Sequence, residues 1–168
     1  ELSYVLVSFF VLIYATYLFN RTKYIFQHAA LFYCICFFLG SIGNIIFPNI
    51  EPWAASLLLI AIGSVWGINT YSKLLQPSWL GYFLSATTIS IGTIILIEDL
   101  IENEIISILI LITGSIFYVW ASIQLAEQVI FFIGGLGLII NLPRLITEIL
   151  PDNIWPPLIL FLVGGVLI

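Results

Sequence analysis

Charged side chains are scarce in this sequence of 168 residues, and polar stretches of any length are missing. Only 8% of the residues are charged, whereas 62% are hydrophobic. A soluble fold of this size cannot enclose so large an apolar fraction, so the composition excludes a soluble globular protein and requires lipid as the surrounding solvent. With only four lysine and arginine residues and a net charge of −5, the chain also lacks the basic clusters that bind nucleic acid or anionic lipid.

Residues that ligate metals are almost as rare. His28 is the single histidine, so a haem or zinc site would need ligands that the chain does not offer. The two cysteines, Cys34 and Cys36, stand two apart on one expected helix and point to different faces, which disfavours a mutual disulfide. No serine or cysteine has a recognisable histidine base and orienting carboxylate. We therefore predict no enzymatic activity, no metal and no cofactor.

Methionine is absent altogether, even at the first position, and the sequence stops at Ile168 within an apolar run. A free carboxylate near the end of a membrane span is costly unless it reaches the interface. We therefore expect the sequence to be an excerpt, with further residues after Ile168.

What the sequence does contain is a series of long apolar runs. Most have the roughly 20 residues that a helix needs to cross about 30 Å of hydrocarbon, and they do not alternate as the strands of a membrane barrel would. The runs cover residues 1–19, 25–47, 53–72, 78–97, 105–125, 128–142 and 154–168. The sixth is short and leads into Pro143, which is typical of a tilted or partly interfacial segment. The fold class predicted is an all-α, polytopic integral membrane helical bundle of about seven spans.

The few basic residues predict the orientation. Arg21 and Lys23 lie between the first and second runs, and Lys73 lies between the third and fourth. Because cytoplasmic loops are enriched in lysine and arginine, these loops are expected to be cytoplasmic. The prediction places the amino end outside and the carboxyl end inside a bacterial cytoplasmic membrane, with Arg144 as the one exception.

Glycine followed by serine or threonine recurs at similar offsets within the apolar runs. Gly63-Ser64 resembles Gly114-Ser115, and each is preceded by a second pair, Gly40-Ser41 and Gly92-Thr93 respectively. This pattern predicts tandem two-helix hairpins. The expected division is an unpaired first helix over 1–24, hairpins over 25–76 and 77–126, and a divergent hairpin over 127–168.

Glycine inside a helix costs about 1 kcal/mol relative to alanine, so its repeated use within spans indicates a close approach of two backbones. The predicted packing residues are Gly40, Ser41, Gly63, Ser64, Gly67, Gly92, Gly114, Ser115, Gly134 and Gly164. A permeation path lined by glycine is the functional alternative to tight packing.

Two short motifs carry a family resemblance. Phe38-Leu39-Gly40-Ser41 and Ile62-Gly63-Ser64 flank a short turn, and this hairpin resembles the YrhK-like membrane domain, an uncharacterised two-helix module. The likeness covers about one quarter to one half of the chain. The resemblance implies a fold unit but no activity and no catalytic residue. The second hairpin departs from the pattern, because Ser90-Ile91 replaces Phe38-Leu39.

Carboxylates are concentrated after the fourth run, on the predicted outer side. They are Glu98, Asp99, Glu102 and Glu104. Their oxygens form a candidate external cation site or a vestibule that collects cations. The segment lacks the glycine of a calcium-binding loop, so a solvated acidic turn is the favoured interpretation.

Glu127 and His28 are the candidate intramembrane polar residues. If the fifth and sixth runs were continuous, Glu127 would be a buried proton or cation site. The run from Glu104 to Asn141 is too long for one span, so we place Glu127 at a tight cytoplasmic turn instead. His28 lies near the predicted cytoplasmic start of the second run, either as a metal, tetrapyrrole or proton-sensing residue or as an ordinary interfacial histidine.

These observations favour a non-enzymatic membrane module that acts as a sensor, scaffold or anchor for other domains or subunits. Its expected partners are membrane lipids and either further copies of itself or the other subunits of a membrane assembly. The alternative is an oligomeric channel or small-solute transporter with a glycine-lined path, but transporters usually retain ionisable residues along that path. A third hypothesis, an enzyme that acts on lipids, would have to use Glu127 and His28.

Overall fold

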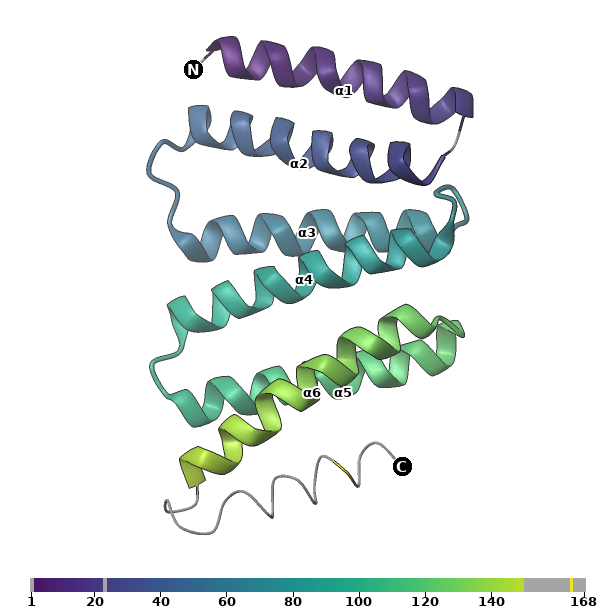
Figure 1. Cartoon of the computed structure of the whole chain (residues 1–168). Helices are drawn as coiled ribbons and strands as arrows, with labels where there is room; N and C mark the ends of the chain where they lie inside the picture. Colours follow the sequence, from purple (N-terminus) through teal and green to yellow (C-terminus); the bar gives the residue numbers. More distant parts are fainter. Residues whose placement is uncertain (1, 23, 150–163, 165–168) are drawn as a thin grey trace. The chain divides into compact units, whose positions relative to one another are not determined.

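The protein is built from α-helices. The computed structural model describes residues 2–22, 24–149 and 164, and this part of the chain forms six helices and no strand (Figure 1). The helices are α1 (Leu2–Thr22), α2 (Ile25–Ile46), α3 (Pro52–Tyr71), α4 (Ser78–Leu100), α5 (Glu104–Leu125) and α6 (Gln128–Ile149). The prediction of an all-helical fold is confirmed.

All six helices are long and apolar enough to cross a membrane, with spans of 20 to 23 residues. At about 1.5 Å per residue these lengths match the hydrocarbon thickness of a bilayer. Every described helix also exposes large apolar side chains, which would be unfavourable in water. These features identify a membrane protein. The seventh predicted span, 154–168, lies outside the described residues apart from Gly164.

Polar and conformationally special residues set the helix ends. At the start of α2 the Tyr24 backbone N–H donates to Gln27 Oε1 at 3.2 Å. Pro52, which has no N–H to leave unsatisfied, begins α3. The Asn103 side chain accepts a hydrogen bond from the Ile106 N–H at 3.2 Å and caps α5. Beyond Leu125, Ala126 takes a left-handed conformation with φ of 53° and ends the same helix.

The last described helix extends further than its apolar run predicted. The sequence pattern ended this run at residue 142, but α6 continues through Pro143 to Ile149. Proline removes one backbone N–H, and membrane helices tolerate that loss when neighbouring groups satisfy the freed carbonyl. The sixth segment is therefore longer than the sequence pattern predicted.

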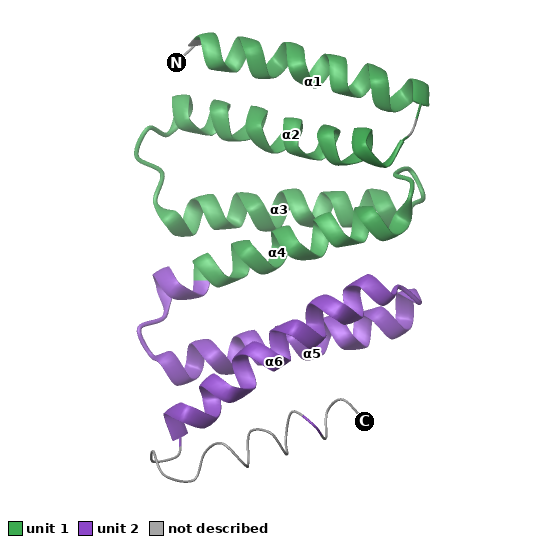
Figure 2. Ribbon diagram, viewed as in Figure 1, with its two compact units in different colours: residues 1–96 green, residues 97–168 purple. Residues whose placement is uncertain are grey.

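The chain divides into two compact units, residues 1–96 and residues 97–168 (Figure 2). The first contains α1, α2, α3 and most of α4, and the second contains the end of α4 with α5 and α6. The hairpin boundaries expected near residues 24, 76 and 126 stay a prediction. In the first unit, apolar residues from all four helices and from the α3–α4 loop share one core: Ala15, Phe19, Leu31, Phe32, Ile62, Trp66, Leu75, Leu80 and Leu84.

Glycines bring α3 and α4 together as an antiparallel pair. A Cβ atom added at Gly63 would lie 3.0 Å from the Ser85 carbonyl oxygen, and one at Gly92 would lie 2.9 Å from the Ser56 carbonyl oxygen. The Ser85 hydroxyl crosses the seam and donates to the Gly63 carbonyl at 2.7 Å. Only hydrogen atoms fit at these glycines, so the close approach of the two backbones depends on them.

The α5–α6 pair also packs a serine of one helix against two glycines of the other. Here the glycines belong to the second helix: a Cβ at Gly134 would lie 2.8 Å from the Ser115 carbonyl oxygen, and Gly137 faces the Ser115 side chain. In α3–α4 the glycines Gly63 and Gly67 of the first helix face Ser85 of the second. Each pair thus places a serine against two glycines of the partner helix.

The predicted packing residues divide into two groups. Close contacts involve Gly63, Gly67, Gly92, Ser115 and Gly134, whereas a Cβ added at Gly40 or Gly114 would meet no heavy atom within 4 Å. Ser41 is half-buried, and the Ser64 hydroxyl donates within its own helix, to the Ile60 carbonyl at 2.7 Å. The neighbours of Gly164 lie outside the described residues.

The aligned glycines are therefore not equivalent in space. Gly63 packs but Gly114 does not, and Gly92 packs but Gly40 does not. The closest glycine contacts join α3 to α4 and α5 to α6, whereas the sequence pattern paired α2 with α3 and α4 with α5. Helical periodicity identifies a small-residue face, but it does not say which neighbour that face meets.

Candidate functional site

His28 is buried between three helices at one end of the first unit. It lies in the first turn of α2 and is fully buried, with 0% of its surface exposed. Its ring centroid is 5.6 Å from that of Phe19 on α1 and 5.5 Å from that of Trp66 on α3, and Trp66 in turn lies 5.0 Å from Phe32. These four residues, Phe19, His28, Phe32 and Trp66, form an aromatic cluster that joins three helices.

The polar atoms of this cluster are not satisfied. Among the described residues, neither Nδ1 nor Nε2 of His28 has a hydrogen-bond partner, and Nε1 of Trp66 also has none. The Gln76 backbone carbonyl, in the α3–α4 loop, faces the imidazole without completing a hydrogen bond. A buried polar group without a partner costs about 1–3 kcal/mol. Most buried polar groups in folded proteins are paired, so three such atoms in one cluster make it a candidate functional site.

The charges around His28 offer no counter-ion to a protonated imidazole. Arg21 at the end of α1 and Lys73 in the α3–α4 loop lie at the same end of the unit, and both are cationic and exposed. The parts of α2, α3 and α4 within the first unit carry no charged residue. Among the described residues of this unit the single carboxylate is Glu51, just beyond the far end of α2, about 30 Å along its axis.

Among the described residues, metal-ligating side chains do not gather around this cluster. The described residues contain no group of three or more histidine, cysteine, aspartate or glutamate side chains that could hold a metal ion. Both cysteines are free and half-buried, and they lie further along α2 than His28. The chemistry that remains for this buried imidazole is gain and loss of a proton.

Glu127 and His28 belong to different units. Glu127 lies in the second unit, between the end of α5 at Leu125 and the start of α6 at Gln128, and its backbone N–H donates to the Ser122 carbonyl at 3.1 Å. Its side chain is half-buried at this tight turn, which is the position that the sequence analysis favoured. The candidate polar site that combined Glu127 with His28 stays a prediction.

The acidic segment does not converge into the predicted cation site. Glu98 and Asp99 lie in the last turn of α4, Glu102 lies in the following loop, and Glu104 begins α5. Within the described chain these carboxylates do not assemble into a ligand set. Glu104 instead forms an exposed ion pair with Arg144 of α6, at 3.3 Å. Arg144 is the basic residue that departs from the predicted cytoplasmic placement of lysine and arginine, and its partner Glu104 lies at the same end of the α5–α6 pair.

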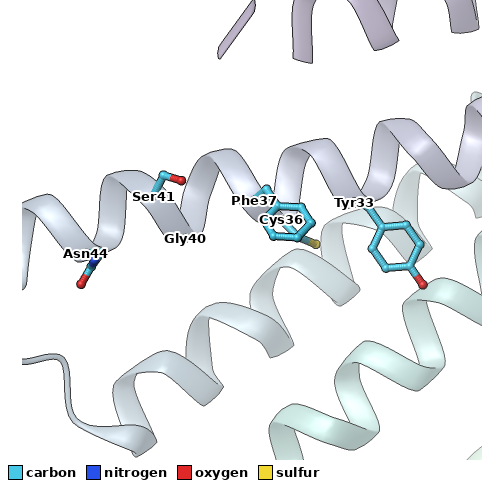
Figure 3. A pocket seen from close by; sticks show the side chains of 6 residues that line it. All are labelled: Tyr33, Cys36, Phe37, Gly40, Ser41 and Asn44. Carbon is cyan, nitrogen blue, oxygen red and sulfur yellow. The ribbon is translucent and has the colours of Figure 1, made fainter. Parts of the chain in front are cut away.

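The outward face of α2 carries a shallow groove of about 520 Å³, lined by Tyr33, Cys36, Phe37, Gly40, Ser41 and Asn44 (Figure 3). Tyr33, Phe37, Gly40 and Asn44 alternate spacings of four and three, so they form one stripe along the helix. Tyr33 and Phe37 are 55% and 71% exposed, whereas Leu31 and Leu39 pack toward the core. This stripe lies on the side of α2 that its own unit leaves uncovered.

Comparison with known proteins adds no further constraint. The chain matches no protein-family model, no curated protein and no solved structure. The likeness of its hairpins to the YrhK-like domain stays a prediction from sequence motifs. Any function must be argued from the residues themselves.

Sequence reasoning identified His28 but not its surroundings. Trp66 and Phe19 belong to different helices, 38 and 9 positions away in the sequence, and no local pattern signals that their rings meet His28. The one available signal was the rarity of a histidine within an apolar run. No sequence pattern predicts that the indole N–H of Trp66 lacks a hydrogen-bond partner among the described residues.

Proposed function

We propose that this protein is a non-enzymatic integral membrane module that acts as a sensor, with His28 as its proton-responsive group. The observation that carries the proposal is the fully buried imidazole, which has no hydrogen-bond partner among the described residues and no nearby carboxylate among those of its own unit. The six membrane-length helices supply the setting. This proposal selects the sensor from the three predicted roles, sensor, scaffold or anchor, and names the residue that responds.

The physical link between proton and structure is the cost of a buried charge. Histidine is the side chain that ordinarily changes charge between pH 5 and 8. A charged group that is buried without a partner is strongly unfavourable. Acidification therefore favours an arrangement in which His28 reaches water or a carboxylate. Because its ring contacts Phe19 and Trp66, such an arrangement must alter the packing of α1 and α3 against α2.

The position of the cluster along the helices suits this role. His28 lies in the first turn of α2, close to the loops that carry Arg21 and Lys73. These loops are the ones predicted to be cytoplasmic. A proton from that side would have a short path to the imidazole, and the resulting movement would occur at helix ends to which other domains or subunits can attach.

The proposal is tested with the full chain in lipid nanodiscs, by following thermal unfolding between pH 8 and pH 5. The stability contributed by the packed neutral imidazole is present at high pH and is lost as the pH falls. We expect the unfolding temperature of the native protein to fall on acidification and that of His28→Leu to change much less. His28 is the only histidine, so no other imidazole contributes to the difference.

A second measurement does not depend on the variant folding. Protein labelled with ¹⁵N in histidine gives the ring signals of a single residue, which report its protonation directly. The proposal expects one transition, coincident with the loss of stability. An imidazole that titrates with no change in stability, or a native protein that loses no more stability than His28→Leu, would rule out the sensing role.

The stripe on α2 favours a second role, assembly with further copies of the chain. Small and polar residues within a span promote helix association, and here Cys36, Gly40 and Asn44 follow each other at intervals of four and line the groove, although Cys36 also packs against the core. Two natural cysteines provide matched variants. Under oxidation Cys34→Ser, which keeps Cys36, should give disulfide-linked dimers, and Cys36→Ser should give few.

The same stripe would line the path of an oligomeric channel or transporter. In that alternative, Cys36 would react with a water-soluble thiol reagent in the assembled protein. In a dry packing contact it would be protected. Equal crosslinking of the two single-cysteine variants would argue against both forms of assembly.

A further inference from the structure

A second hollow of about 850 Å³ lies between α2 and α3, at the end of the first unit opposite His28. Its walls include Ile42, Ile46, Phe47, Trp53 and Leu58. This volume is within the range of about 300–1,000 Å³ that is usual for small-molecule sites. Because its lining is predominantly apolar and comes from membrane-length helices, the hollow is suited to a hydrocarbon chain.

Gly43 forms an open part of this groove. A Cβ atom added at Gly43 would meet no heavy atom within 4 Å, although the residue lines the hollow. This glycine therefore serves no close backbone contact among the described residues, unlike Gly63 and Gly92. Its missing side chain leaves free volume where α2 and α3 separate toward their connecting loop.

The mouth of the groove carries a carboxylate. Glu51 precedes α3 and lines the hollow together with Asn49, and its Oε2 accepts a hydrogen bond from the Trp53 indole N–H. No basic side chain of the first unit's described residues lies at this end, because Arg21 and Lys73 lie in or beside the loops at the other end. The negative charge of Glu51 is therefore not balanced by the unit itself.

We propose that this groove binds a phospholipid whose headgroup bears a primary ammonium, as in phosphatidylethanolamine. An acyl chain occupies the apolar hollow, and the ammonium N–H groups donate to the Glu51 carboxylate. A quaternary ammonium keeps the charge but has no N–H to donate, and an anionic glycerol headgroup is repelled by the carboxylate. The site is independent of the role proposed for His28, since it lies about 30 Å away along α2.

The test is native mass spectrometry of the full chain, released from membranes that contain equal amounts of phosphatidylethanolamine, phosphatidylcholine and phosphatidylglycerol. We expect the ethanolamine lipid to be retained preferentially. Glu51→Gln should lower that preference by about two- to fivefold, the range for an exposed charged contact. The matched control is Glu148→Gln, which removes an exposed carboxylate of the second unit and should leave the preference unchanged.

A groove-filling variant separates the acyl chain from the headgroup. Gly43→Leu places its side chain in open space, so it should fold, and it should lower retention of every phospholipid. Gly40→Leu, which is equally open but lines the groove with Tyr33 and Phe37 instead, should retain lipid normally. Equal retention of the three lipids by the native chain, an unchanged preference in Glu51→Gln, or full retention by Gly43→Leu would each overturn the proposal. If Gly43→Leu retained lipid but no longer formed a dimer, the occupant of the groove would be a second copy of the chain, and the proposal would be overturned as well.

Discussion

Replacing Gly134 by alanine should separate α6 from α5. The added Cβ would lie 2.8 Å from the Ser115 carbonyl oxygen and 3.0 Å from Tyr118 Cβ and Val119 Cγ2. Ordinary contacts begin at 3.4 Å, so the backbones must move apart by about 0.6 Å for normal packing. The neighbouring Gly135 is the matched control, because a Cβ there would meet no heavy atom within 4 Å.

Comparison of Gly134→Ala with Gly135→Ala isolates the free-energy cost of overpacking the α5–α6 contact. Overpacking of a well-packed contact costs about 1–3 kcal/mol. The replacement of glycine by alanine within a helix gains about 1 kcal/mol of intrinsic propensity, and this gain is the same at both positions. Gly134→Ala should therefore be less stable than Gly135→Ala by about 1–3 kcal/mol, the overpacking cost alone.

Reversible unfolding of the full chain in mixed micelles, induced by sodium dodecyl sulfate and followed by circular dichroism, measures this difference. Gly135→Ala should unfold at or above the detergent fraction of the native protein, and Gly134→Ala below it. If the two variants unfold together, the α5–α6 contact does not depend on Gly134, and the reasoning from backbone approach fails.

Three further substitutions test the ends of the helices in the same unfolding assay. Ala126→Gly should stabilise the protein by about 0.5–1 kcal/mol, because Ala126 adopts a φ of 53° that favours glycine; a loss of stability would contradict that turn. Asn103→Ala should cost about 1 kcal/mol through loss of the cap on α5, and Asn103→Asp should restore it. Glu104→Gln should cost less than about 1 kcal/mol, because its ion pair with Arg144 is more than half exposed, and the cost should vanish in high salt; a larger, salt-independent loss would indicate a structural role.

The positions of the helices could be read from the sequence with little error. The run predicted over 25–47 corresponds to α2 at Ile25–Ile46, and that over 53–72 corresponds to α3 at Pro52–Tyr71. Apolar length and the charges and prolines between runs determine where a span begins and ends, and these are local properties. The extent of α6 was missed because Pro143 signals a helix end in water but is tolerated in a membrane helix.

Contacts between helices could be predicted only in part. The small-residue motifs include Gly63, Gly92 and Gly134, where the structure has close approaches of two backbones. The motifs could not identify the partner of each glycine, nor that Gly114 faces open space while its neighbour Ser115 makes the contact. The burial of His28 depends on rings from two other helices, so its environment exists only once the unit is assembled.

The glycine-serine contacts have a consequence for biogenesis. In both pairs the serine and its glycines belong to helices that are consecutive in the chain, separated by the loop over 72–77 or by the short turn at Ala126 and Glu127. Contacts between close neighbours in sequence require little loop closure and form early. Each pair can therefore close as soon as its second helix has left the ribosome, before the rest of the chain is synthesised. Insertion would then proceed in two-helix steps, in which the glycine face of one span is covered by the other span of its pair.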